Sequence, residues 1–235
     1  MMPARADSTA SRHNSCRAST SGRMLTVLTV LSLALAGCSS LFPAASPQPA
    51  FYALQALQGP TPATGAAGQR MTTPTSGARA PVLVVQVPSA APGFGSGRII
   101  YTRQPHRLET FARHEWVEAP ARMLAPLMVA ALQGGGAFSA VVLAPSAAIG
   151  GLQLDTQLLR LQQEFGSPPS RVRLTLRAQL IHTSSRQVLA TRDFEHLAVS
   201  ESEDAPGGVA AAQVAVHAVL GEMVSWCTAA VAGQR

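Results

Sequence analysis

The chain of 235 residues has a formal net charge of +6, and all 18 of its cationic side chains are arginine. The absence of lysine excludes catalysis through a Schiff-base lysine. Four of the arginines and one of the 12 acidic residues precede Cys38, so the remainder of the chain keeps a charge of only about +3. Its arginines are scattered, unlike the clustered basic surface of a nucleic-acid-binding protein.

The N-terminal segment has the layout of a bacterial lipoprotein signal. An apolar run of 14 residues, Met24–Gly37, follows Arg17 and Arg23 and ends in Leu35-Ala36-Gly37-Cys38. A bilayer core of about 30 Å needs about 20 apolar residues, so this run is too short to span it and suits a signal peptide. The resemblance to a lipobox implies that residues 1–37 are removed and that Cys38 becomes the acylated, palmitate-carrying N-terminus. The alternatives are an ordinary signal peptide with a chance cysteine and a buried helix.

The next segments are expected to connect the lipid to one folded domain. Residues 38–50 are mostly small and uncharged and include prolines, which is typical of a flexible tether. Phe51-Tyr52-Ala53-Leu54 is a short strand signal. Residues 59–80 consist mainly of Gly, Pro, Thr and Ala, so we expect a disordered insert in a single domain that covers residues 51–230.

The folded core is expected to start near Pro81 with a β-branched run. Val82–Val87 predicts a strand buried on both faces. Residues 98–103 and 108–116 predict two more strands, and the turn around Pro105 favours a hairpin between them.

A helix is predicted to open at Glu118-Ala119-Pro120, because proline is tolerated in the first helical turn. Gly134-Gly135-Gly136 is expected to end it. Pro126 must then either kink this helix or show that the helix proper begins later. Another strand is predicted over residues 138–143.

Strands dominate the next part of the chain. The parity of the apolar residues changes between Leu158 and Leu159, which predicts a β-bulge there, and Pro168-Pro169 predicts a turn. The clearest strand is Arg171–Ile181, in which polar and apolar side chains alternate. Its apolar members are Val172, Leu174, Leu176, Ala178 and Leu180. This alternation indicates one buried face, one wet face and antiparallel pairing.

A strand over residues 188–196 and a C-terminal helix complete the expected elements. The helix is predicted from about Val209 to Cys227, with an apolar stripe at helical spacing. The acidic run Glu201–Asp204 suits the positive N-terminus of that helix. The predicted fold class is therefore α+β, with a mixed, mainly antiparallel sheet and two helices packed on one face.

Catalytic and metal-binding patterns are absent or incomplete. His114-Glu115-Trp116-Val117-Glu118 begins like a zinc-protease motif, but Glu118 stands where the second histidine ligand belongs. Gly93-Phe94-Gly95-Ser96-Gly97 fits neither a nucleophile elbow nor a dinucleotide-binding loop. Cys16 is expected to leave with the signal peptide and Cys38 to be acylated, so Cys227 remains alone as a packed apolar residue, and no disulfide or cysteine metal site is predicted. Because no catalytic pattern is complete, the protein is expected to need no cofactor and not to be an enzyme.

Three blocks of sequence carry a resemblance to a known family. They are residues 98–124, residues 136–142 and residues 188–194, and Tyr52-Ala53-Leu54 precedes them in the same order. Together they resemble the ABC-type transport auxiliary lipoproteins, with the cholesterol-transport auxiliary branch as the most similar. The block from Tyr101 to Leu124 is the most specific, whereas the insert at residues 59–80 is unlike a compact family member.

The resemblance implies a transport role without catalysis. Its expected partners are an inner-membrane ABC permease and ATPase and a periplasmic MCE-type (mammalian cell entry) protein, with the lipoprotein docking that protein at the outer membrane. Ser39 rather than Asp follows Cys38, which under the enteric sorting rule favours the outer membrane, facing the periplasm. Whether the protein forms a homo-oligomer stays open. The alternatives are a lipoprotein that regulates a cell-wall or outer-membrane assembly enzyme and, more remotely, a periplasmic hydrolase.

Overall fold

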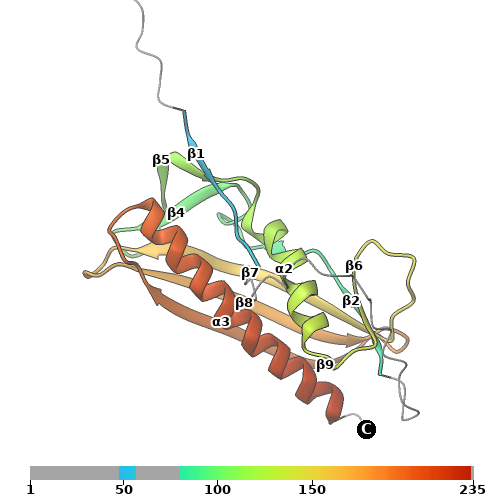
Figure 1. Cartoon of the computed structure of the whole chain (residues 1–235). Coiled ribbons are helices and arrows are strands. Elements are labelled where there is room, and N and C mark those ends of the chain that lie inside the picture. Colours follow the sequence, from blue (N-terminus) through green and yellow to red (C-terminus); the bar gives the residue numbers. More distant parts are fainter. Residues whose placement is uncertain (1–47, 57–79, 234–235) are drawn as a thin grey trace, which may run out of the picture. The chain divides into compact units, whose positions relative to one another are not determined.

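The computed structural model describes residues 48–56 and 80–233, in which two helices cover one face of a nine-stranded mixed sheet (Figure 1). This arrangement confirms the predicted α+β class. The predicted signal peptide, most of the tether and nearly all of the insert lie outside the described residues. The elements are β1 (Ala50–Tyr52), β2 (Val82–Val85), β3 (Ser89–Ala90), β4 (Arg98–Thr102), β5 (Glu109–Trp116), α2 (Pro120–Gly134), β6 (Ala140–Leu143), β7 (Leu152–Glu164), β8 (Arg171–His182), β9 (Gln187–Val199) and α3 (Ala205–Ala232).

Strand β7 organises the sheet because different partners share one of its edges. Strand β8 pairs antiparallel along the whole of the other edge and is itself followed by β9, so most of the registered residue pairs are antiparallel. The shared edge pairs in parallel with β2 near Leu152, with β3 near Gln157 and with β4 near Glu164. The sheet therefore forks: β2 leads to β6 at one end, and β4 leads to β5 and β1 at the other (Figure 1).

The alternation predicted for residues 171–181 is confirmed in β8. Every predicted apolar residue of this strand is at most 2% exposed, whereas Arg171 and Arg177 on the opposite face are exposed. Since β8 lies between β7 and β9, its buried face forms the centre of the core, beneath α3.

The β-bulge and the hairpin are also confirmed. The register of β7 with β8 shifts between Leu158 and Arg160, where the apolar parity changes. Strands β4 and β5 pair antiparallel, as predicted for residues 98–116.

The prediction that Val82–Val87 is buried on both faces is wrong in part. Strand β2 ends at Val85, and Val87 is 45% exposed. Leu83 and Val85 are fully buried, but Val82 and Val84 are only half-buried. The physical reason is that both helices lie on the same face of the sheet, so the other face of β2 has no covering layer.

Helix α2 resolves the alternatives left open for Pro126. The helix begins at Pro120, so a later start is wrong, and it continues through Pro126 to Gly134. Pro126 lies on the exposed face of the helix. Water can therefore reach the carbonyl that loses its hydrogen bond to the missing proline N–H.

Helix α3 is longer than predicted at both ends. It begins four residues earlier, at Ala205, because Asp204 caps it through a 2.9 Å hydrogen bond from Gly207 N to its carboxylate. It is also the helix of the described residues that is long and apolar enough to cross a membrane. In this fold the apolar stripe of α3 forms part of the hydrophobic core, because Val216, Val219 and Met223 are fully buried against the sheet.

Candidate functional site

The residue predicted to carry the lipid, Cys38, lies outside the described residues, and its acylation stays a prediction. The candidate site within the described residues is the block most specific to the family resemblance, Tyr101–Leu124. It contains the end of β4, all of β5 and the first turns of α2.

The incomplete zinc-protease pattern lies at the end of β5, where His114 and Glu118 have structural partners. The Tyr52 hydroxyl lies 2.9 Å from His114 Nδ1, and Glu118 forms an exposed ion pair with Arg122 at 3.1 Å. Among the described residues, no three His, Cys, Asp or Glu side chains gather into a metal-binding group. The contacts of His114 and Glu118 therefore stabilise the end of β5 and the start of α2.

A half-buried aromatic cluster links the hairpin to its neighbours. The ring centroids of Tyr101 and Phe111 lie 4.6 Å apart, and Phe165, just after β7, meets the Tyr101 ring edge-on at 5.7 Å. Phe111 also approaches His114, which stacks on Tyr52 of β1. Such aromatic pairs stabilise a fold beyond their buried area. The cluster therefore joins β1, β4, β5 and the end of β7 into one unit.

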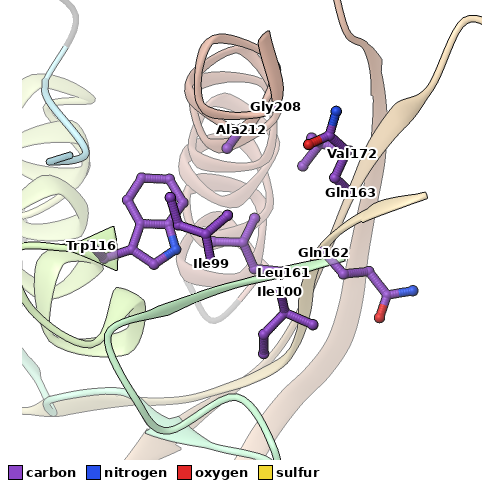
Figure 2. A pocket seen from close by; sticks show the side chains of 9 residues that line it. All are labelled: Ile99, Ile100, Trp116, Leu161, Gln162, Gln163, Val172, Gly208 and Ala212. Atoms are coloured by element: carbon purple, nitrogen blue, oxygen red, sulfur yellow. The ribbon is translucent and has the colours of Figure 1, made fainter. Parts of the chain in front are cut away.

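A small cavity lies between the β4–β5 hairpin and α3, and Figure 2 shows it from close by. Its lining comes from four strands and one helix: Ile99, Ile100, Trp116, Leu161, Gln162, Gln163, Val172, Gly208 and Ala212. The volume of about 10 Å³ leaves room for about one water molecule. This cavity is a gap in the packing and is too small for a lipid or another organic ligand.

Gln163 is the buried polar residue that sequence reasoning missed. It is 2% exposed, and its Nε2 lies 3.0 Å from Ser170 Oγ. Its Oε1 has no hydrogen-bond partner among the described residues and points toward Gly208 of α3 (Figure 2). A Cβ on residue 208 would lie 2.8 Å from Gln163 Cδ, so glycine is needed for this close approach. The contact fixes the end of β7 against the first turn of α3.

The helix-free face of the sheet carries a ladder of ion pairs. Arg173 of β8 bridges Glu164 of β7, at 2.8 Å, and Glu195 of β9, at 2.6 Å. Burial alone would raise the pKa of Glu164, but hydrogen bonds from Arg173 and Gln162 lower it overall. Hydrogen bonding to Arg177 lowers the pKa of Asp193 in the same way. This face is thus polar and charged, as the alternation in β8 predicts.

The larger hollows are open to solvent. One of about 440 Å³ lies between α2 and α3 and is lined mainly by small residues such as Ala131, Gly135 and Gly221. Another, of about 390 Å³, lies on the charged face beside Asp155 and Arg177. In neither hollow does a lining hydroxyl group form a hydrogen bond with a lining carboxylate or histidine. Cys227 is fully buried, and its burial raises the pKa of the thiol to about 12, so this cysteine is held unreactive.

The sequence model of the ABC-type transport auxiliary lipoprotein component family matches residues 65–224. The chain belongs to this family. The match includes the hairpin, the aromatic cluster except Tyr52, and the Gln163–Gly208 contact.

Solved structures share the fold of this transport auxiliary lipoprotein. Protein XCC0632 from Xanthomonas campestris is 25% identical, with a TM-score of 0.63 over 78% of this chain and 96% of that one. An uncharacterized protein at 11% identity has a TM-score of 0.58 over 77% of this chain and 99% of that one, which shows the fold alone. The PelC dodecamer from Paraburkholderia phytofirmans is 16% identical over 64% of this chain and 92% of that one. Its TM-score is only 0.40, too low to establish a shared fold. Among proteins with curated descriptions, none matches the sequence.

Proposed function

We propose that this protein is the lipid-anchored auxiliary component of an ABC/MCE-type intermembrane lipid transport system, and that it docks the periplasmic MCE protein at the outer membrane. The observation that carries this proposal is the family match over residues 65–224. The lipobox at Leu35–Cys38 supports it, because an auxiliary that holds a partner at a membrane needs an anchor there. The protein acts in this scheme as an assembly component and not as an enzyme.

The chemistry of the described residues supports a binding role. His114 and Glu118 of the protease-like motif already have partners, and the hollows above 300 Å³ are open to solvent. Small-molecule sites usually enclose most of their ligand, so these hollows suit contact with a macromolecule better than capture of a single lipid. The broad charged face of β7, β8 and β9 offers such a contact area.

Replacing Cys38 with Ser should block processing of the signal peptide and release the domain from the membrane, because serine has no thiol to acylate. The measurement is the N-terminal mass of the protein together with its distribution between membrane and soluble fractions. Density separation of native envelopes should recover the unaltered protein in the outer membrane. Normal processing and membrane retention of Cys38→Ser would refute the anchor.

Deleting the gene should weaken the outer-membrane barrier as much as deleting the ABC permease, and the double deletion should add nothing further. The parts of one conduit fail together, whereas independent pathways give additive defects. Affinity purification from solubilised envelopes should recover the MCE protein with this lipoprotein. Additive defects without MCE recovery would favour the alternative, a lipoprotein that regulates an envelope assembly enzyme.

A further inference from the structure

The turn between β4 and β5 projects beyond the end of the sheet. Strand β4 runs parallel to β7, and the last residue pair of the two strands joins Thr102 to Glu164, the final residue of β7. Residues 103–108, called the hairpin tip below, therefore lie past that end. Every residue of the hairpin tip is exposed.

The chain enters the domain from the same end. Strand β1 runs parallel to β5, with Ala50 beside His114, so it leads away from the hairpin tip, and residues 48 and 49 approach it from the tip side. Figure 1 shows β1, β4 and β5 together at one end of the sheet, away from β2 and β6. The 12 residue steps from Cys38 to Ala50 span at most about 40 Å when extended. A lipid on Cys38 would thus keep this end of the domain close to the membrane.

The hairpin tip has the composition of a membrane-surface contact. It contains Arg103 and Arg107 and ends in Leu108, which is 48% exposed. Arg103 lies over the Tyr101 ring, 5.2 Å from its centroid, and the side chain of Arg107 is 66% exposed even though it pairs with Glu109 at 3.3 Å. Exposed arginines beside an apolar side chain are attracted to anionic headgroups.

Most of the acidic residues near this end of the sheet have hydrogen-bond or ion-pair partners of their own. Glu109 pairs with Arg107 and Glu164 pairs with Arg173, and three further acids, Glu201, Glu203 and Asp204, follow β9. Glu203 accepts a hydrogen bond from Ser170 N, and Asp204 accepts one from Gly207 N. Arg103 takes part in no ion pair among the described residues, so the hairpin tip keeps a positive charge for an anionic surface.

We infer that the hairpin tip lies against the anionic headgroups of the membrane that carries the lipid anchor. This inference rests on the proposed acylation of Cys38. It adds a second, weaker contact beside the anchor, so that the domain is held at a defined orientation instead of hanging freely on its tether.

The test uses the full processed lipoprotein, purified in detergent and reconstituted into nanodiscs of phosphatidylcholine alone or with phosphatidylglycerol. A polarity-sensitive fluorophore is attached to Gln104→Cys at the hairpin tip or to Ser184→Cys in the exposed turn between β8 and β9. The second turn lies beside Leu152, at the opposite end of β7, roughly 40 Å away for a strand of 13 residues. Cys227 is buried and Cys38 is acylated in this scheme, so neither competes for the label.

The fluorophore at residue 104 should shift to the blue in anionic nanodiscs, and the fluorophore at residue 184 should not. Arg103→Gln together with Arg107→Gln should remove the shift, since each arginine lost lowers the contacting population about fivefold. Arg186→Gln, which removes a charge from the opposite turn, should leave the shift unchanged. Mass and co-elution with the nanodisc report the anchor separately.

An acylated, disc-bound protein whose residue-104 fluorophore stays in water would overturn the inference and leave the anchor intact. Equal shifts at residues 104 and 184, equal shifts with and without phosphatidylglycerol, or a shift that needs added MCE protein would overturn it too. If the mass shows that the chain is not acylated, both the proposed lipid anchor and the membrane contact of the hairpin tip are contradicted.

Discussion

Replacing Leu176 with Asp should unfold the domain or bring it close to unfolding. Leu176 is fully buried in the middle of β8, where it pairs with Leu158 and Phe194. A carboxylate placed there has to be desolvated or protonated, at a cost of about 4 kcal/mol or more. Domains are commonly stable by only about 5–15 kcal/mol, so most of the folded population is at risk. Urea unfolding monitored by circular dichroism measures the loss.

Thr175→Asp is the matched control because the side chain of residue 175 points to the charged face. There it donates a 3.1 Å hydrogen bond to Glu195. An aspartate loses this bond and faces a like charge, but water screens the repulsion, and we expect a loss of about 1 kcal/mol or less. Similar losses at both positions would mean that β8 is covered on both faces.

Replacing Gly207 with Ala should destabilise the protein by about 2–4 kcal/mol. An added Cβ would lie 2.8 Å from Ser202 N and closer still to the Ser202 carbonyl oxygen. Because these are backbone atoms, the loop before α3 has to move. That movement also breaks the bond from Gly207 N to Asp204, which caps the helix.

Gly221→Ala provides the opposite expectation within the same helix. Nothing lies within 4 Å of a Cβ on residue 221. Alanine is the better helix former, so this change should stabilise the protein by up to about 1 kcal/mol. Thermal and urea midpoints of the two variants should therefore move in opposite directions. A neutral or stabilising Gly207→Ala would show that the loop does not pack tightly on the helix.

The sequence predicts those parts of the fold that depend on local periodicity. The alternation in residues 171–181 identifies the buried face of β8, and the parity change at Leu158 locates the bulge in β7. The start of α3 could not be predicted in the same way. Pro206, Gly207 and Gly208 disfavour a helix interior. In the structure they form the first turn of α3, because Asp204 caps the helix there and the close contacts of the two glycines leave no room for a Cβ.

The parts that the sequence does not reveal depend on distant contacts. The fork of the sheet arises because β2, β3 and β4 all pair with one edge of β7, and no local pattern encodes such non-local parallel pairing. The burial of Gln163 depends on a glycine in α3, 45 positions further along the chain. The Gly-Gly pair at a helix start is a signal that could have suggested this contact, whereas Gln163 stands between Gln162 and Glu164 in a polar stretch that does not indicate burial.

The parallel pairing of β1 with β5 has a mechanical consequence for an anchored protein. If Cys38 is acylated as proposed, a pull from the membrane enters the domain ahead of Ala50 and acts along the axis of β1. The three residue pairs of β1 and β5, together with the bond from Val117 N to Tyr52 O, then share the tension in shear and do not open one after another. The stacked Tyr52 and His114 rings pass this tension to the hairpin and from there to β7. In an anchored protein the short first strand would thus pass tension from the membrane to the core through several bonds at once.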